Sequence, residues 1–183
     1  MPSHSFLSAS DPSPWVTRHA AMLPAGAEVL DLACGGGRHA RWLSAHGMAV
    51  VAADRDAAAL APLDALAGVQ TLCVDLEDGD WPWTPASFDA VIVTRYLFRP
   101  RLDRVLGLLR PGGLLIYETF MQGNERFGKP SNPDFLLRPH ELLDLVRGWG
   151  RVLAFEQGEV AQPAPAMIQR ICAVGGEAPL RLP

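Results

Sequence analysis

The sequence is short of positive charge, cysteine and long apolar runs, and each shortage excludes a class of protein. Lysine and arginine together number 16 against 20 acidic residues, and Lys129 is the only lysine. A net charge of −4 gives no bulk attraction for nucleic acid or an anionic membrane, although it leaves room for a local basic patch. No apolar run approaches the roughly 20 residues that span a bilayer, so we expect no membrane partner.

The scarce cysteines and scattered histidines also exclude several kinds of site. Cys34, Cys73 and Cys172 are far apart and form neither a C-x-x-C pair nor a disulfide framework. This usage is typical of a reducing compartment and predicts a cytoplasmic protein. The opening MPSHSFLSASDPSP lacks the basic region and apolar core of a secretory signal. No metal is expected, because these histidines form no ligand set: His4, His19, His46 and His140.

What the chain does contain is a regular alternation of strand-like and helix-like stretches. With 183 residues and 49% hydrophobic content it can bury one core. We expect a flexible N-terminus over 1–12, a single domain over 13–176 and a tail over 177–183. Five apolar runs predict strands at 28–33, 48–53, 69–74, 88–93 and 114–120. The stretches between them predict helices at 37–47, 56–68 and 101–113, after a first helix at 14–23 whose Trp15 is expected to pack. This order favours an α/β fold with a doubly wound, mostly parallel sheet.

Prolines and glycines refine the expected boundaries. Pro62 is expected to kink or shorten the helix over 56–68, and Pro111 with two glycines to end the helix over 101–113. The acidic, proline-rich stretch 75–87 predicts a loop. After the fifth strand, a long polar loop over 121–139 leads to a helix at 140–150, and strands at 151–160 and 166–176 predict an antiparallel C-terminal hairpin.

The most informative motif joins an acid to three glycines. Residues 29–43 read VLDLACGGGRHARWL, with Asp31 on the first strand and Gly35 to Gly37 in the turn that follows. Side-chain-free residues in this turn let a ligand approach the backbone. The glycines also fit a dinucleotide pattern, but a buried acid would repel a pyrophosphate and attract an amino group. The motif therefore favours S-adenosylmethionine, while Asp31 contacting amides of its own loop remains the alternative.

Two more strands end in acids that suit a nucleoside. Asp54 ends the second strand and is predicted to accept hydrogen bonds from ribose hydroxyls, unless it serves as a helix N-cap, for which Asp56 is better placed. Asp75 is placed for the adenine amino group and Leu76 for the ring. His39 is expected to fix the glycine loop or face solvent. The predicted cofactor site comprises Asp31, Ala33, Cys34, Gly35, Gly36, Gly37, Asp54, Arg55, Asp75, Leu76 and Arg95.

Taken in order, VLDLACGGGRHARWL, AADRD, VDLED, SFDAVIV and LRPGGLLIYETF resemble the class I S-adenosylmethionine-dependent methyltransferases. The resemblance covers about residues 13–175. It implies a seven-stranded, Rossmann-like sheet in the order 3-2-1-4-5-7-6 with strand 7 antiparallel, and it places Asp31, the glycines, Asp54, Asp75 and Leu76 at the cofactor. More loosely, YETF followed by GKPSNPDFLL resembles small bacterial methyltransferases of the tellurite-resistance type.

Methyl transfer chiefly requires alignment of nucleophile, methyl group and sulfur, so a general base is optional. Tyr96, Glu118 and Arg126 are the candidate catalytic residues, and Arg126, Lys129 and Asn132 the candidate acceptor-binding residues. The alternatives are that Tyr96 packs under a helix, that Glu118 pairs with an arginine, and that the loop over 121–139 is merely solvated. The chain lacks the Asn/Asp-Pro-Pro-Tyr/Phe motif of amino-directed methylases.

The sequence therefore predicts a methyltransferase acting on a small molecule, as a monomer or homodimer. Three other functions stay open: RNA methylation, non-catalytic cofactor binding, and a nicotinamide oxidoreductase, which Asp31 disfavours. Methylation of RNA would need a basic patch built from Arg95, Arg99, Arg101, Arg104 and Arg126.

Overall fold

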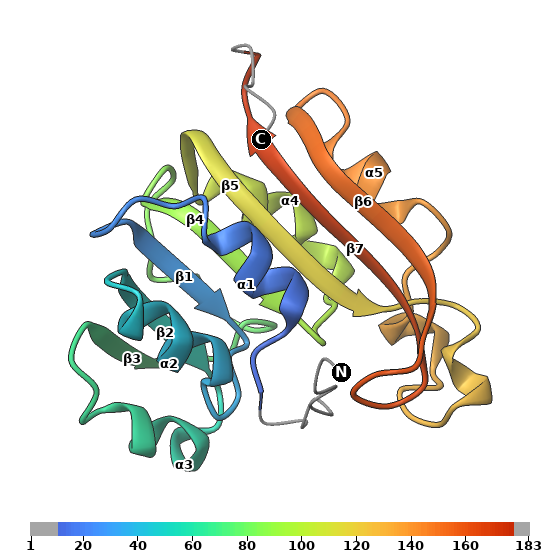
Figure 1. The fold of residues 1–183 in the computed structure, drawn as a ribbon, viewed down its shortest axis with the longest axis horizontal. Coiled ribbons are helices and arrows are strands. Elements are labelled where there is room, and N and C mark those ends of the chain that lie inside the picture. Colours follow the sequence, from blue (N-terminus) through green and yellow to red (C-terminus); the bar gives the residue numbers. More distant parts are fainter. Residues whose placement is uncertain (1–10, 178–183) are drawn as a thin grey trace, which may run out of the picture.

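A seven-stranded sheet forms the centre of the molecule, in a computed structural model that describes residues 11–177 (Figure 1). The strand order is β3-β2-β1-β4-β5-β7-β6. The strands are β1 (Glu28–Leu32), β2 (Ala49–Asp54), β3 (Val69–Cys73), β4 (Phe88–Thr94), β5 (Leu109–Phe120), β6 (Gly150–Val160) and β7 (Ala166–Gly175). The predicted α/β fold and its strand order are confirmed.

Strand direction also agrees with the prediction. β1 to β5 pair in parallel, whereas β7 runs antiparallel to both β5 and β6. Parallel strands bring their carboxyl ends to one edge of the sheet, and strand order reverses beside β1, so this is the edge where such folds bind ligands.

Helices cover both faces of the sheet. α1 (Pro14–Ala20), α2 (Arg38–Ala45) and α3 (Ala57–Leu60) pack on one face, and α4 (Leu102–Gly107) and α5 (Glu141–Val146) on the other (Figure 1). Alternate β1 side chains serve the two layers: Leu30 and Leu32 belong to the core under α4 and α5, and Val29 to the core under α1 and α2. This alternation directs Asp31 towards α2.

The helices are all shorter than predicted, and the differences at α3 and α4 have identifiable causes. The helix predicted over 101–113 ends at Gly107, and the expectation that Pro111 and its two glycines end it is wrong. Residues 109–113 instead begin β5, because Leu109 pairs with Phe88 across an irregularity in the β4–β5 ladder. The helix over 56–68 is shortened at Pro62, as anticipated: α3 passes into a 3₁₀ turn, η1 (Ala61–Leu63).

The loop over 121–139 is folded rather than extended. It contains the 3₁₀ turns η3 (Asn124–Arg126) and η4 (Pro133–Phe135), and a further turn, η2 (Arg99–Arg101), precedes α4. Among the described residues, no helix is long and apolar enough to cross a membrane, and all three cysteines are free. The tails predicted over 1–12 and 177–183 lie largely outside the described residues.

Candidate cofactor and acceptor site

The glycine turn after β1 leaves open space beside the backbone. Gly35 and Gly37 have φ values of +53° and +70°, in the left-handed region that glycine favours. A Cβ atom at Gly35 or Gly36 would meet nothing within 4 Å. A Cβ at Gly37 would lie 2.3 Å from Leu63 Cδ1, so this glycine is required by packing. The backbone at the first two glycines is therefore unobstructed, and the third glycine allows the close approach of η1.

Asp31 is completely buried beneath this turn. Its Oδ2 accepts a hydrogen bond from the Ala40 N–H at 3.1 Å, which is the internal contact considered as the alternative. Its Oδ1 has no hydrogen-bond partner. Burial raises the pKa of Asp31 to about 7, against the lowering effect of the Ala40 N–H. A buried carboxyl group with one unsatisfied oxygen is costly, and a nearby cation would stabilise its ionised form.

A pocket of about 130 Å³ lies at the ends of the first four strands. Its lining includes the predicted residues Ala33, Asp54, Arg55, Asp75 and Leu76, together with Val74, Glu77 and Tyr96. Asp54 accepts hydrogen bonds from the Gly35 N–H at 2.7 Å and from the Asp56 N–H at 3.0 Å. Asp56 caps α3, as expected. Asp54 thus ties β2 to the glycine turn and has further acceptor capacity towards the pocket.

Hydrogen bonds to the Leu76 carbonyl hold the part of the pocket that follows β3. The Leu76 carbonyl accepts hydrogen bonds from Trp81 Nε1 at 3.0 Å and Arg101 Nη1 at 2.9 Å. The Tyr96 hydroxyl is buried without a hydrogen-bond partner, and burial raises its pKa. Sequence reasoning missed Glu77 as a pocket residue, because an acid in an acidic loop carries no local signal of its direction.

A second, larger cleft of about 680 Å³ lies beside the carboxyl ends of β4 and β5. Its lining comes from residues 11–14, Arg38 of α2, the ends of β4 and β5, the loop after β5, the β6–β7 connection over 161–165, and the start of β7. Arg38, Arg95, Glu118, Lys129 and Arg170 supply its charged walls together with Asp11. Nothing in the sequence indicated that residues 11–14 and 161–165 would meet.

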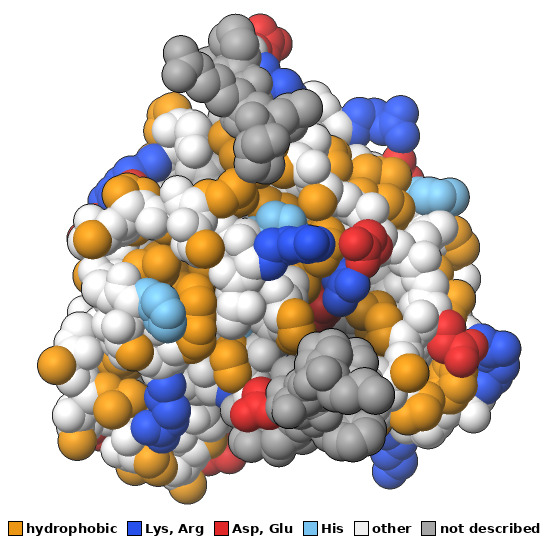
Figure 2. Space-filling view, in the orientation of Figure 1, with side chains coloured by type: hydrophobic (Ala, Val, Ile, Leu, Met, Phe, Trp, Pro, Cys, Tyr) orange, Lys and Arg blue, Asp and Glu red, His pale blue; other side chains and the backbone are white. Residues whose placement is uncertain are grey.

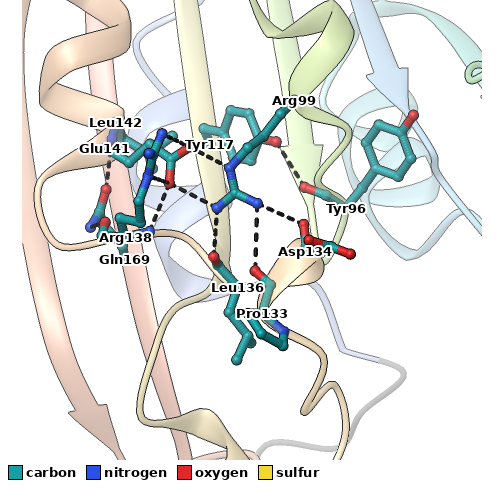
Figure 3. Close-up of polar contacts among 10 residues, drawn as sticks. All are labelled: Tyr96, Arg99, Tyr117, Pro133, Asp134, Leu136, Arg138, Glu141, Leu142 and Gln169. Atoms are coloured by element: carbon teal, nitrogen blue, oxygen red, sulfur yellow. Dashed lines mark hydrogen bonds and ion pairs between the residues drawn. The ribbon is translucent and has the colours of Figure 1, made fainter.

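Arg95 and Tyr96 are consecutive residues that line different cavities. Arg95 lines the cleft and Tyr96 the smaller pocket. The backbone of Arg95 has a φ of +53°, which is unusual for a residue other than glycine. The Arg95 N–H donates to the Glu118 carbonyl at 3.0 Å, and the Tyr117 hydroxyl donates to the Tyr96 carbonyl at 2.8 Å (Figure 3). β5 thereby fixes the turn that separates the two cavities.

The remaining candidates make contacts of their own. Glu118 pairs with Arg170 at 3.2 Å, as its alternative interpretation anticipated. Arg126 is exposed and lies 3.7 Å from Glu159, and Asn132 caps η4 by accepting from the Asp134 N–H. Cys34 is buried, and burial raises the pKa of its thiol. Among residues 11–177, no cluster of three His, Cys, Asp or Glu side chains could hold a metal ion.

Two arginines of the hypothetical RNA patch are engaged within the protein. Arg99 donates hydrogen bonds from Nε and Nη2 to the Glu141 carboxylate, and it also donates to the carbonyls of Asp134 and Leu136 (Figure 3). Arg101 donates to the carbonyls of Leu76 and Gly79. On the face shown in Figure 2, the described basic side chains are scattered and several lie beside acidic ones.

Comparison with known proteins agrees with this geometry. Residues 29–113 match the methyltransferase domain family. A tRNA U34 carboxymethyltransferase from Methylococcus capsulatus is 30% identical over 85% of this chain, and the match spans about half the length of that curated relative, 53%.

Solved structures share the fold at lower identity. A methyltransferase from Methanosarcina mazei has a TM-score of 0.69 at 15% identity, with 90% of this chain and 98% of that chain covered. TehB from Haemophilus influenzae has a TM-score of 0.70 at 19% identity, with 90% and 63% covered. The 1,6-didemethyltoxoflavin-N1-methyltransferase from Burkholderia thailandensis, solved with S-adenosylhomocysteine, has a TM-score of 0.68 at 21% identity, with 90% and 77% covered. Residues 29–113 are therefore similar to a methyltransferase domain, and the chain shares the fold of S-adenosylmethionine-dependent methyltransferases.

Proposed function

We propose that this protein transfers a methyl group from S-adenosylmethionine to a small molecule bound in the larger cleft. The observation that carries the proposal is the pair of cavities separated by the turn at Arg95 and Tyr96. One cavity is small and rich in carboxylates, which suits a nucleoside without phosphates, and the other is large enough for an organic molecule.

The residues present fit the cofactor. The open space at Gly35 and Gly36 and the unsatisfied Oδ1 of Asp31 suit the cationic methionine portion. Asp54 would hold the ribose hydroxyls. Asp75 and Leu76 would hold the adenine. Ala33, Cys34, Arg55 and Gly37 would complete the surroundings of the cofactor, whereas Arg95, also expected there, lines the larger cleft.

When bound, S-adenosylmethionine supplies a methyl group on a positively charged sulfur, which keeps the bonding electron pair as the acceptor's lone pair bonds to the methyl carbon. The chain's own residues then have to orient the acceptor and exclude water. The contacts of Glu118, Tyr96 and Arg126 favour such positioning roles over proton abstraction. Of the three residues proposed to bind the acceptor, Lys129 lines the cleft, and Arg126 and Asn132 would act through the loop that carries it.

The name of the tRNA-modifying relative makes RNA the main competing acceptor. The internal contacts of Arg99 and Arg101 favour a small molecule, because these guanidinium groups already satisfy backbone carbonyls and Glu141. We further propose that the protein works in the cytoplasm, as a monomer or homodimer.

Calorimetry with S-adenosylhomocysteine tests the cofactor site. Asp54→Asn should bind about 10- to 100-fold more weakly, because it loses charge-assisted acceptance of hydroxyl groups. Asp56→Asn is the matched control: Asp56 is exposed, and asparagine caps helices equally well, so binding should stay unchanged. The absence of binding by the unmodified protein, or unaltered binding by Asp54→Asn, would contradict the assignment.

A further inference from the structure

The charges that line the larger cleft are unbalanced. Among residues 11–177, four basic side chains and two acidic ones line it. Glu118 forms an ion pair with Arg170, which also pairs with Glu156, and Glu118 acts on Arg38 at longer range. Basic side chains still outnumber acidic ones in the described lining, and an anion would reduce this excess of positive charge.

Arg95 is the cation placed most directly for a ligand. Its side chain is exposed to the cleft, and within residues 11–177 no carboxylate forms an ion pair with it. Arg38 lies close enough to Arg95 that the like charge, after burial, lowers the pKa of Arg38. Arg38 and Arg95 line the same cleft and repel each other, so a carboxylate bound near both would interact favourably with each.

Most of the remaining cleft wall is apolar. Phe120, Phe127, Ile168 and the prolines of the β6–β7 connection line it, and Phe127 keeps an exposed ring. A cleft of about 680 Å³ is larger than an inorganic oxyanion needs and falls within the range of sites for organic ligands. Its described lining includes no histidine, cysteine or tyrosine that could serve as a general base.

From these observations we infer that the methyl acceptor is a small organic anion, with a carboxylate or similar group held by Arg95 beside Arg38 and Lys129, and an apolar body against Phe120, Phe127 and Ile168. This inference rests on the proposed function. The anionic group that these cations hold has two possible sources, the acceptor and the cofactor's own carboxylate, and the experiment separates them.

The first arm identifies the acceptor class. A cell extract is divided before reaction into small molecules retained by an anion exchanger, small molecules not retained, and nucleic acid, and each is incubated with methyl-labelled cofactor. Label should enter the small, retained fraction. Label found only in the unretained small molecules or only in nucleic acid would overturn the inference, although it would still show that the protein transfers methyl groups. No label anywhere overturns the proposed function itself.

The second arm locates the anion. Arg95→Gln should lower kcat/KM on the retained fraction about 10- to 100-fold while S-adenosylhomocysteine binds as before. Arg95→Lys should recover much of the activity, and Arg41→Gln, an exposed arginine on the same helix as Arg38, should change neither quantity. If Arg95→Gln weakens S-adenosylhomocysteine but not 5′-methylthioadenosine, which lacks the carboxylate, the anion is the cofactor's and the inference fails.

Discussion

The Ser13 backbone N–H donates a hydrogen bond to His39 Nε2 at 3.1 Å, which joins the start of α1 to the first turn of α2. Nδ1 of the same ring faces Thr94 Oγ1 at the end of β4, at 3.5 Å. Because Ser13 and its neighbours line the larger cleft, His39 holds one wall of that cleft against the sheet. His39 was expected to fix the glycine loop or face solvent; its buried ring instead contacts Ser13 and Thr94.

The contact between Ser13 and His39 makes the fold sensitive to acid. Burial, with Arg38 and Arg95 nearby, lowers the pKa of His39 to about 3, whereas the unfolded chain titrates near 6.5. The unfolded state therefore binds more protons between these values, and the stabilising contribution of neutral His39 is lost as pH falls below about 6.5. Relative to His39→Gln, the unmodified protein should lose about 2–3 kcal/mol of unfolding free energy between pH 7 and pH 4, measured by denaturant titration. Parallel pH profiles for the two proteins would contradict this.

Gly36 and Gly37 should respond differently to the same substitution. Gly37→Ala places a Cβ against Leu63 in a left-handed backbone, so we expect a loss of about 1–2 kcal/mol in unfolding free energy. The Cβ added by Gly36→Ala would contact no atom within 4 Å, and the Gly36 backbone lies outside the left-handed region. Stability should therefore change little, while S-adenosylhomocysteine should bind at least about tenfold more weakly. Thermal unfolding and calorimetry on both variants measure the two effects. Normal binding by Gly36→Ala would show that the ligand does not occupy this space.

The parts of the fold that sequence predicted are those whose signals are local. Apolar runs located the strands to within a few residues, and the acids at the ends of two strands, Asp54 and Asp75, indicated two residues that line the small pocket. The extension of β5 back to Leu109 was missed because it depends on pairing with Phe88, not on Pro111 and its glycines.

The larger cleft was less predictable because segments distant in sequence build it. Glu118 meets Arg170 only through the register of β5 against β7, and the residues before α1 reach the cleft through His39. No spacing within the sequence encodes either pairing.

Arg99 should be the principal link between the loop after β5 and the rest of the domain. Burial would raise the pKa of Glu141, but hydrogen bonds from Arg99 and Arg138 outweigh it and lower that pKa to about 2. Arg99→Lys loses the planar fork that reaches Glu141 and two carbonyls, so unfolding free energy should fall by about 2–3 kcal/mol. Amide hydrogen exchange should rise over 133–141. The exposed pair Arg147–Asp144 provides the control, since Arg147→Lys should cost less than about 0.5 kcal/mol.

Ligand binding should release a proton from Asp31. The carboxyl of Asp31, with a pKa of about 7 in the folded protein, is largely protonated at pH 6. A cationic amino group arriving at the glycine turn favours the ionised form, so its pKa falls and the proton leaves. Affinity for S-adenosylhomocysteine should therefore rise between pH 5 and pH 7 and level off above.

The released proton can be counted by calorimetry at pH 6 in buffers of different ionisation enthalpy. We expect about 0.5–1 proton released per ligand by the unmodified protein. Asp31→Asn, which keeps an acceptor for the Ala40 N–H but cannot ionise, should release none from this position and bind with a flatter pH profile. Equal proton release by both proteins would mean that Asp31 serves only its internal contact with Ala40 and does not sense the ligand's charge.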